Sequence, residues 1–186
     1  GTYELPNQAD VYLFVGRFEG QKDPMLLLNA FKLVKNRNPK ACLILIGEGS
    51  LKGEMQSFIR QHQLDDAVRF LPSMPQRLIA DWMSSANALC LSSAFEGMPR
   101  VVVEALHCGL PVVSTNVGET GRLIGNGKGG LLVREEGAEV FADAMEQLIQ
   151  NPPNVKSCRK QVESFTAKKV LTLVYQYYEK LLKAKQ

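Results

Sequence analysis

The chain alternates between short apolar runs and longer segments whose apolar residues recur with the period of a helix. Strands buried on both faces read as nearly continuous aliphatic runs, and helical crossovers join them in a parallel sheet. We expect strands at 11–15, 41–46, 67–71, 88–92, 111–114 and 131–133. We expect helices at 24–37, 50–63, 76–85, 99–108, 137–150, 155–163 and 166–184. This order predicts an α/β fold in three layers, α/β/α, around a parallel sheet of about six strands.

Size and charge exclude several classes of protein. A chain of 186 residues buries about 70% of its unfolded surface, so the fold needs no metal or disulfide staple. The net charge of +3 is too small for the dense basic stripe of a nucleic-acid-binding surface. The C-terminal lysines are interpreted as a solvated helix face, with a phosphate or membrane-surface role left open. They are Lys168, Lys169, Lys180, Lys183 and Lys185.

Cysteine usage indicates a reducing compartment. Cys42, Cys90, Cys108 and Cys158 lie far apart, without a C-x-x-C pair, and the chain has only two histidines. This argues against a zinc site and a disulfide framework and suits the cytosol. The sequence shows no signal peptide and no apolar run long enough to span a bilayer. We therefore expect a cytoplasmic protein.

The loops that follow the strands are the places to look for chemistry. Parallel crossovers are right-handed, so every strand-to-helix loop emerges at the same edge of the sheet, where ligands bind. These loops are 16–23, 47–49, 72–75, 93–98 and 115–120.

The loop 16–23 reads GRFEGQKD and begins with the turn residue Gly16. Arg17 and Lys22 in this loop can neutralise a diphosphate, Arg by a planar fork and Lys as a point charge. The alternative is that both are solvated loop charges, which contribute little to stability.

Two carboxylates, Glu96 and Glu104, are separated by seven intervening residues around the start of the helix expected at 99–108. Carboxylates in such places accept hydrogen bonds from sugar hydroxyls. The structural alternative for Glu104 is an i,i+4 ion pair with Arg100, and for Glu96 a solvent-facing carboxylate near a helix start. Neither alternative explains why both acids flank an edge that already carries Arg17.

Gly97 and Pro99 open this helix. The free N–H groups and the positive dipole end of a helix start make an anion site. A phosphate can dock on the backbone amides of Met98, Arg100 and Val101.

A glycine-rich turn raises a different possibility. Gly47, Gly49 and Gly53 follow the second expected strand with the spacing G-x-G-x-x-x-G. Such turns can cradle a dinucleotide, so an NAD(P)-dependent oxidoreductase is an alternative. That fold requires an acid at the end of the next strand to bind the ribose. Here this strand ends in FLPS, and Asp65–Asp66 precede it, so the acid is missing.

Five segments in order and spacing carry a resemblance: GRFEGQKDP, IGEGS, VRFLP, SSAFEGMPRVVVEALHCGLPVVSTNVG and GKGGLLV. Together they resemble the C-terminal nucleotide-sugar-binding domain of retaining GT-B glycosyltransferases, especially glycosyltransferase family 4. The similarity covers roughly residues 10 to 150, and its most specific part is the segment with two glutamates separated by seven residues, together with the A-x-x-C-G-L-P-V-V that follows. The fold it implies is one Rossmann-like half of a GT-B enzyme.

The resemblance implies a role for each matching residue. The diphosphate of the donor would be held by Arg17, Lys22, Gly97, Met98 and Arg100. Glu96 would contact the transferred sugar, with a possible catalytic part, and Glu104 would bind the ribose. The base would be contacted by main-chain atoms of Phe70, Leu71 and Pro72. Supporting glycine turns would lie at Gly16, Gly47 and Gly49.

The resemblance also implies the reaction. It is a retaining, metal-independent transfer from a nucleotide diphosphate sugar, a UDP-sugar by preference or a GDP-sugar, with no cofactor. No Asp-x-Asp motif is present to hold a divalent ion. The acceptor would be a sugar, a lipid-linked glycan or a lipopolysaccharide, in polysaccharide or lipopolysaccharide biosynthesis. The full-length protein would then work in the cytoplasm, at the inner face of the cytoplasmic membrane if it associates peripherally.

The chain lacks an initiating Met, so we expect a fragment. Residues 1–9 would be an interdomain linker or a cloning remnant, 10–150 the nucleotide-sugar-binding domain, and 151–186 helices that pack back toward a missing N-terminal domain. Such a fragment would bind nucleotide and transfer sugar poorly or not at all.

Two positions depart from the family pattern. Arg122 stands where an acid is usual, and His107 occupies a position that is normally apolar, where it is interpreted as a packed helix histidine. A noncatalytic nucleotide-binding module is a further alternative, since folds host many functions. A UDP-sugar hydrolase or epimerase with the same fold is another.

Overall fold

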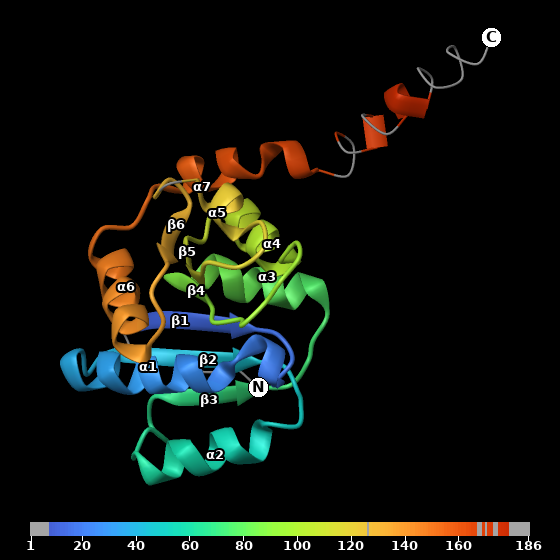
Figure 1. Cartoon of the computed structure of the whole chain (residues 1–186). Coiled ribbons are helices and arrows are strands. Elements are labelled where there is room, and N and C mark those ends of the chain that lie inside the picture. The colour runs from blue at the N-terminus through green and yellow to red at the C-terminus, as the bar shows by residue number, and fades with distance from the viewer. Residues whose placement is uncertain (1–7, 126, 167–168, 170, 173–174, 179–186) are drawn as a thin grey trace.

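The computed structural model describes residues 8–125, 127–166, 169, 171–172 and 175–178. Its centre is a six-stranded sheet in the order β3-β2-β1-β4-β5-β6, in which every pair of neighbours is parallel. The strands are β1 (Asp10–Val15), β2 (Ala41–Ile46), β3 (Val68–Leu71), β4 (Ala88–Leu91), β5 (Val112–Thr115) and β6 (Gly130–Val133). The predicted parallel α/β sheet is therefore confirmed (Figure 1).

Seven α-helices connect and cover the strands within the described residues. They are α1 (Pro24–Arg37), α2 (Lys52–Gln61), α3 (Gln76–Ser85), α4 (Arg100–Cys108), α5 (Thr120–Ile124), α6 (Ala138–Gln150) and α7 (Val155–Gln161). Two 3-10 turns lie at Gly20–Lys22 and Glu163–Phe165. Only α5 was not expected, because its five residues are too short to show a helical period.

Helix starts follow local chemistry. Pro24 is the first residue of α1, and the Asp23 side chain caps the helix by accepting a hydrogen bond from the Leu26 N–H at 3.0 Å. Pro99 was expected at the first helical position, but α4 begins at Arg100 and Pro99 is its N-cap. A cap needs extended backbone angles, which Pro99 adopts with a ψ of 96°.

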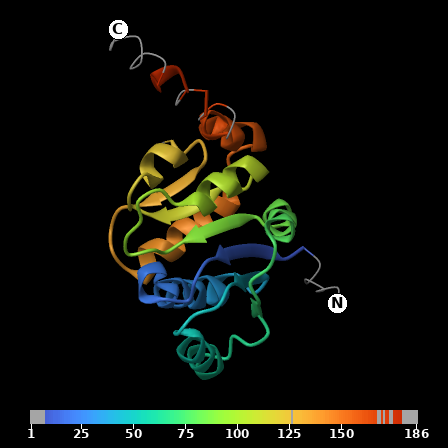
Figure 2. The ribbon, with the colours of Figure 1, turned by 90° about the vertical axis from the view of Figure 1, so that its right-hand side faces the viewer.

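Helices cover both faces of the sheet. One core cluster joins α1, α2 and α6 to one face, and a second joins α3, α4, α5 and α7 to the other. Figure 2 shows this arrangement with the molecule turned by 90°. All six residues of β2 are buried, which explains why its sequence is an unbroken apolar run.

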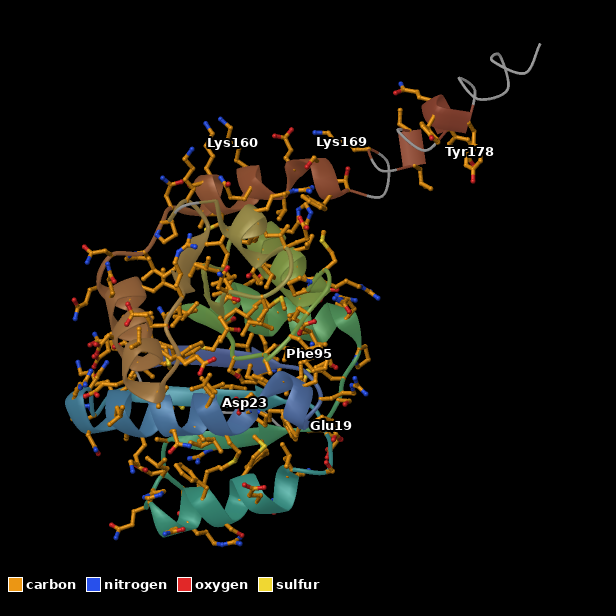
Figure 3. The ribbon with its side chains drawn as sticks, in the orientation of Figure 1. Glu19, Asp23, Phe95, Lys160, Lys169 and Tyr178 are labelled. Carbon is orange, nitrogen blue, oxygen red and sulfur yellow. The ribbon has the colours of Figure 1, made fainter. Side chains whose placement is uncertain are left out.

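The C-terminal expectations fall partly outside the described residues. The helix expected at 166–184 includes 167–168, 170, 173–174 and 179–184, which are not described, and residues 1–7 of the expected linker are not described either. The described residues beyond 166 project away from the sheet, as Lys169 and Tyr178 show (Figure 3). In the described part of the chain, no helix combines the length and apolar character that a membrane crossing requires.

The strand order fixes where a ligand can bind. β1 pairs with β2 on one side and with β4 on the other, so the chain reverses its direction of winding between β1 and β4. The helices that follow these strands, α1 and α4, consequently lie on opposite faces. In such folds ligands bind at the carboxyl edge of the sheet, at the point where the strand order reverses.

Candidate functional site

The loops after β1 and β4 meet in an ion pair between Lys22 and Glu96. Lys22 closes the 3-10 turn after β1, and Glu96 lies in the loop between β4 and α4. The two side chains are only 18% and 8% exposed. The topology thus brings together one cation and one carboxylate that the sequence predicted for the same site.

Two adjacent serines at the end of β4 fix this pair. Ser93 Oγ donates a hydrogen bond to Glu96 Oε1 at 2.8 Å, and Ser92 Oγ donates to the Lys22 carbonyl oxygen at 2.9 Å. Thr115 Oγ1, at the end of β5, donates to the Ser93 carbonyl oxygen at 2.7 Å. Sequence reasoning missed these three residues, although the doublet SS before AFEG was a visible signal.

Gln21 joins the two loops and contacts Arg17. The Ala94 N–H donates to the Gln21 carbonyl oxygen at 2.9 Å, and Gln21 Nε2 donates to the Phe95 carbonyl oxygen at 3.3 Å. Glu19 and Phe95, from the two loops, lie on the side toward which the arrows of β1 and β3 point (Figures 1 and 3). Arg17 is exposed and makes one long hydrogen bond, 3.4 Å, to Gln21 Oε1. Its guanidinium therefore stays accessible to a ligand.

The start of α4 is open to an anion. Pro99 provides no side-chain cap, so the first N–H groups of the helix retain their donor capacity. Glu104 lies 3.9 Å from Arg100, with side chains 29% and 87% exposed. The ion pair with Arg100, which was the structural alternative for Glu104, is therefore present, but at this distance and exposure it contributes little to stability.

The glycine turns permit close backbone approach. Gly47 has a φ of +149°, and a Cβ there would lie 1.9 Å from the Gly16 carbonyl oxygen. A Cβ on Gly49 would lie 2.3 Å from the Phe18 carbonyl oxygen. A Cβ on Gly53 would meet nothing within 4 Å, so this third glycine has no such role. Gly47 and Gly49 therefore allow the loops after β1 and β2 to pack closely against each other.

The residues predicted to contact the base lie at the end of β3. Phe70 and Leu71 are its last two residues, and Pro72 is the first exposed residue after it. The Phe70 ring packs edge-on against Phe18, with centroids 5.7 Å apart. The Leu71 carbonyl oxygen accepts from the Gly47 N–H at 3.1 Å. Base contact by these main-chain atoms stays a prediction.

Comparison with known proteins assigns the family. The model of the family described as "Glycosyl transferases group 1" matches residues 2–165. The chain belongs to this family. It is 35% identical over 156 residues to a D-inositol 3-phosphate glycosyltransferase of Pseudarthrobacter chlorophenolicus. The aligned residues make up 82% of this chain and 36% of the relative. The chain spans about a third of the length of the curated relatives it matches.

Solved structures of glycosyltransferases share the fold. A sucrose-phosphate synthase of Thermosynechococcus elongatus aligns with a TM-score of 0.83 at 25% identity, over 97% of this chain and 47% of that one. A pneumococcal O-GlcNAc transferase, solved in complex with UDP and GlcNAc, aligns with a TM-score of 0.82 at 19% identity, over 96% of this chain and 37% of that one. The predicted Rossmann-like half of a GT-B fold is confirmed by these neighbours.

Gly118 is a further residue that shapes the site in this family member. It has a φ of +49°, and a Cβ there would lie 2.2 Å from the Gly97 carbonyl oxygen and 2.4 Å from that of Glu96. The Glu119 N–H donates to the Gly97 carbonyl oxygen at 3.1 Å. The turn before α5 therefore packs closely against the backbone of the loop that carries Glu96.

The two departures from the family pattern, Arg122 and His107, differ in how they contact the rest of the chain. Arg122 pairs with Glu119 at 3.2 Å and lies over the Phe165 ring, 5.4 Å from its centroid. It therefore links α5 to the segment after α7. His107 is exposed on α4, and its carbonyl oxygen accepts from Arg159 Nε at 3.1 Å. The expectation that His107 is packed is wrong, because it falls on the outer side of α4, where α7 meets its backbone.

A cavity of about 500 Å³ opens beside the ion pair. It lies where β4, β5 and β6 end, between the N-terminal turns of α1 and α6. Ser93 forms part of its wall and donates to Glu96, which is not itself a lining residue. The cavity thus adjoins the carboxylate without containing it.

Glu19 fixes the loop after β1 to the entrance of α2. Its carboxylate accepts hydrogen bonds from the Ser50 N–H at 2.9 Å and from Ser50 Oγ at 2.7 Å. These bonds favour the charged form and lower the pKa of Glu19 below its ordinary value. The loop that carries Arg17 and Lys22 is therefore held at both ends.

Proposed function

We propose that this chain is the donor-binding half of a retaining, metal-independent glycosyltransferase of family 4. The observation that carries the proposal is the Lys22–Glu96 pair at the carboxyl edge of the sheet, where the strand order reverses between β1 and β4, beside the uncapped start of α4. A diphosphate needs fixed cations and free N–H groups, and a sugar needs a fixed carboxylate. All three lie at this one edge.

Each group would act on a different part of the donor. When the bond between the anomeric carbon and the diphosphate breaks, negative charge grows on the leaving diphosphate. Arg17, Lys22 and the amides at the start of α4 would stabilise that charge without reorganising. Glu104, one helix turn into α4, would accept hydrogen bonds from the ribose hydroxyls. The acceptor oxygen would bond to the anomeric carbon on the face that the diphosphate leaves, which gives retention, and its proton would pass to the leaving diphosphate.

Glu96 is proposed as the contact to the transferred sugar. Its pairing with Lys22 would orient the carboxylate beside the site of bond cleavage. A carboxylate there can accept hydrogen bonds from sugar hydroxyls and stabilise positive charge that develops on the sugar ring. We assign it no nucleophilic role.

The nucleotide is proposed to be a UDP-sugar, with a GDP-sugar as the alternative. The support is that structural neighbours were solved with UDP, including the pneumococcal O-GlcNAc transferase and an Anabaena protein in complex with UDP and glucose. The acceptor would be a sugar, a lipid-linked glycan or a lipopolysaccharide. A further domain would supply most of the acceptor site, because this chain matches only 36% of the length of that relative of Pseudarthrobacter chlorophenolicus.

Calorimetric titration with UDP, GDP, ADP and NAD tests the proposal. We expect UDP or GDP to bind, and binding of NAD alone, or of no nucleotide, would reject it. Arg17→Ala should weaken nucleotide binding by about 1.5–3 kcal/mol, the worth of a hydrogen bond to a charged group. Arg60→Ala, which removes an exposed arginine of α2, is the matched control and should leave binding unchanged.

A further inference from the structure

The carboxylate of Glu96 is held from one side only. Lys22 Nζ and Ser93 Oγ both donate to the same oxygen, Oε1. Neither donor touches Oε2, and among the described residues every buried side-chain oxygen or nitrogen has a hydrogen-bond partner. Oε2 is therefore the oxygen of Glu96 that keeps contact with the outside.

We propose that Ser93 is a positioning residue, which fixes the Glu96 carboxylate so that Oε2 faces the transferred sugar. This inference rests on the proposed function. An ammonium group is a point charge that either carboxylate oxygen can satisfy. A hydroxyl is directional, because its single O–H must point at one oxygen. Ser93 thus supplies the orientation that Lys22 alone does not.

Ser93 is itself immobilised. Ser93 is only 1% exposed, and its carbonyl oxygen accepts a hydrogen bond from Thr115 Oγ1 at 2.7 Å. The neighbouring Ser92, also 1% exposed, fixes the backbone of Lys22. The two serines thus hold both members of the ion pair: Ser92 binds the main chain of Lys22, and Ser93 binds the carboxylate of Glu96.

The role of Ser93 predicts a selective defect. Ser93→Ala should weaken binding of UDP-glucose about tenfold, the lower end of the worth of a hydrogen bond to a charged group. Binding of UDP, which has no hexose for Glu96 to contact, should change less than about twofold. A purely structural defect would weaken both ligands equally.

A double-mutant cycle provides the decisive reading. In a Glu96→Ala background, Ser93→Ala should cause no further loss of UDP-glucose affinity, because the group through which it acts is gone. Ser114→Ala is the matched control: Ser114 is also fully buried, and its hydroxyl donates to the Thr115 carbonyl oxygen at 2.7 Å, away from Glu96. This control should leave the affinity ratio of UDP-glucose to UDP unchanged.

The experiment is calorimetric titration of the 186-residue chain and its variants. The wild type is titrated with UDP, UDP-glucose and UDP-N-acetylglucosamine. The variants are then titrated with UDP and with whichever of the two sugar donors binds the wild type more tightly. If Ser93→Ala does not fold, Ser93→Cys keeps the volume and removes the strong donor, and the same selective loss is expected. Equal losses for UDP and the sugar donor, additive losses in the cycle, or no loss at all overturn the role of Ser93. Wild-type protein that binds no nucleotide overturns the proposed function, and the role of Ser93 with it.

Discussion

Lys22 and Glu96 lie 74 residues apart in the sequence, yet their side chains form a mostly buried ion pair at the edge of the sheet. Removing one partner of such a pair leaves the other charge in a poorly hydrated place. Lys22→Ala should therefore destabilise the chain by about 1–3 kcal/mol, measured by urea unfolding. The double variant with Glu96→Ala should be more stable than Lys22→Ala alone, because no unpaired charge remains.

The matched control for this prediction is Lys52→Ala. Lys52 pairs with Glu48 at 2.9 Å, but the two side chains are 36% and 50% exposed. Loss of this pair should cost less than about 1 kcal/mol. Equal effects of Lys22→Ala and Lys52→Ala would show that burial does not strengthen the first pair.

Glu104→Ala tests recognition of the ribose. UDP should bind the variant about 1.5–3 kcal/mol more weakly, because a carboxylate that accepts hydroxyl donors is lost. The wild type should also discriminate against 2′,3′-dideoxy-UDP, and the variant should not. Glu54→Ala, which removes an exposed acid from α2, should bind UDP as the wild type does. A variant that still prefers UDP over the dideoxy analogue would remove Glu104 from the site.

Gly118→Ala should damage both stability and binding. A side chain at a φ of +49° is strained, and its Cβ would clash with the carbonyl oxygens of Glu96 and Gly97. We expect a loss of about 2 kcal/mol or more in the free energy of unfolding, together with weaker UDP binding. Gly53→Ala, where a Cβ meets nothing within 4 Å, should be neutral or stabilising by up to about 1 kcal/mol. Unimpaired folding of Gly118→Ala would contradict the close approach.

The Glu19–Ser50 contact predicts a pH dependence. The pKa of Glu19 is lower in the folded state than its ordinary value near 4.5. Its contribution to stability is therefore present above the unfolded-state pKa and is lost as the pH falls through the folded-state pKa. Glu19→Gln should flatten the acid side of the profile of unfolding midpoint against pH. Ser50→Ala should change it in the same direction, and an unaltered profile in both variants would refute the linkage.

The fold was predictable because its signals are local. The apolar runs located all six strands to within one residue at each end, since strands covered on both faces are mostly apolar. Length limited the rest: α5 is five residues long and lies between the left-handed glycines Gly118 and Gly125. Its sequence reads as a loop, and in the fold it packs against β5, β6, α4 and α7.

The sequence predicts members of the candidate site but not the network of contacts between them. The residues Lys22, Glu96 and Arg17 were found from their loops and from a resemblance. Their pairing depends on which strands are neighbours, and that order is a property of the whole sheet. Ser93 and Gly118 carry no charge, and what they do depends on contacts that form only in the folded chain. Ser93 matters because its hydroxyl donates a 2.8 Å hydrogen bond to Glu96. Gly118 matters because a Cβ there would lie only 2.2 Å from the Gly97 carbonyl oxygen.

The strand order also divides the molecule into two halves that are each continuous in the chain. β1, β2 and β3 form one half and β4, β5 and β6 the other. Only two register pairs, Tyr12 with Ala88 and Leu13 with Leu89, join β1 to β4, whereas six join β1 to β2. Lys22 belongs to the first half and Glu96 to the second. The ion pair therefore spans the junction between the two halves, and an opening along β1 and β4 would separate the cation from the carboxylate.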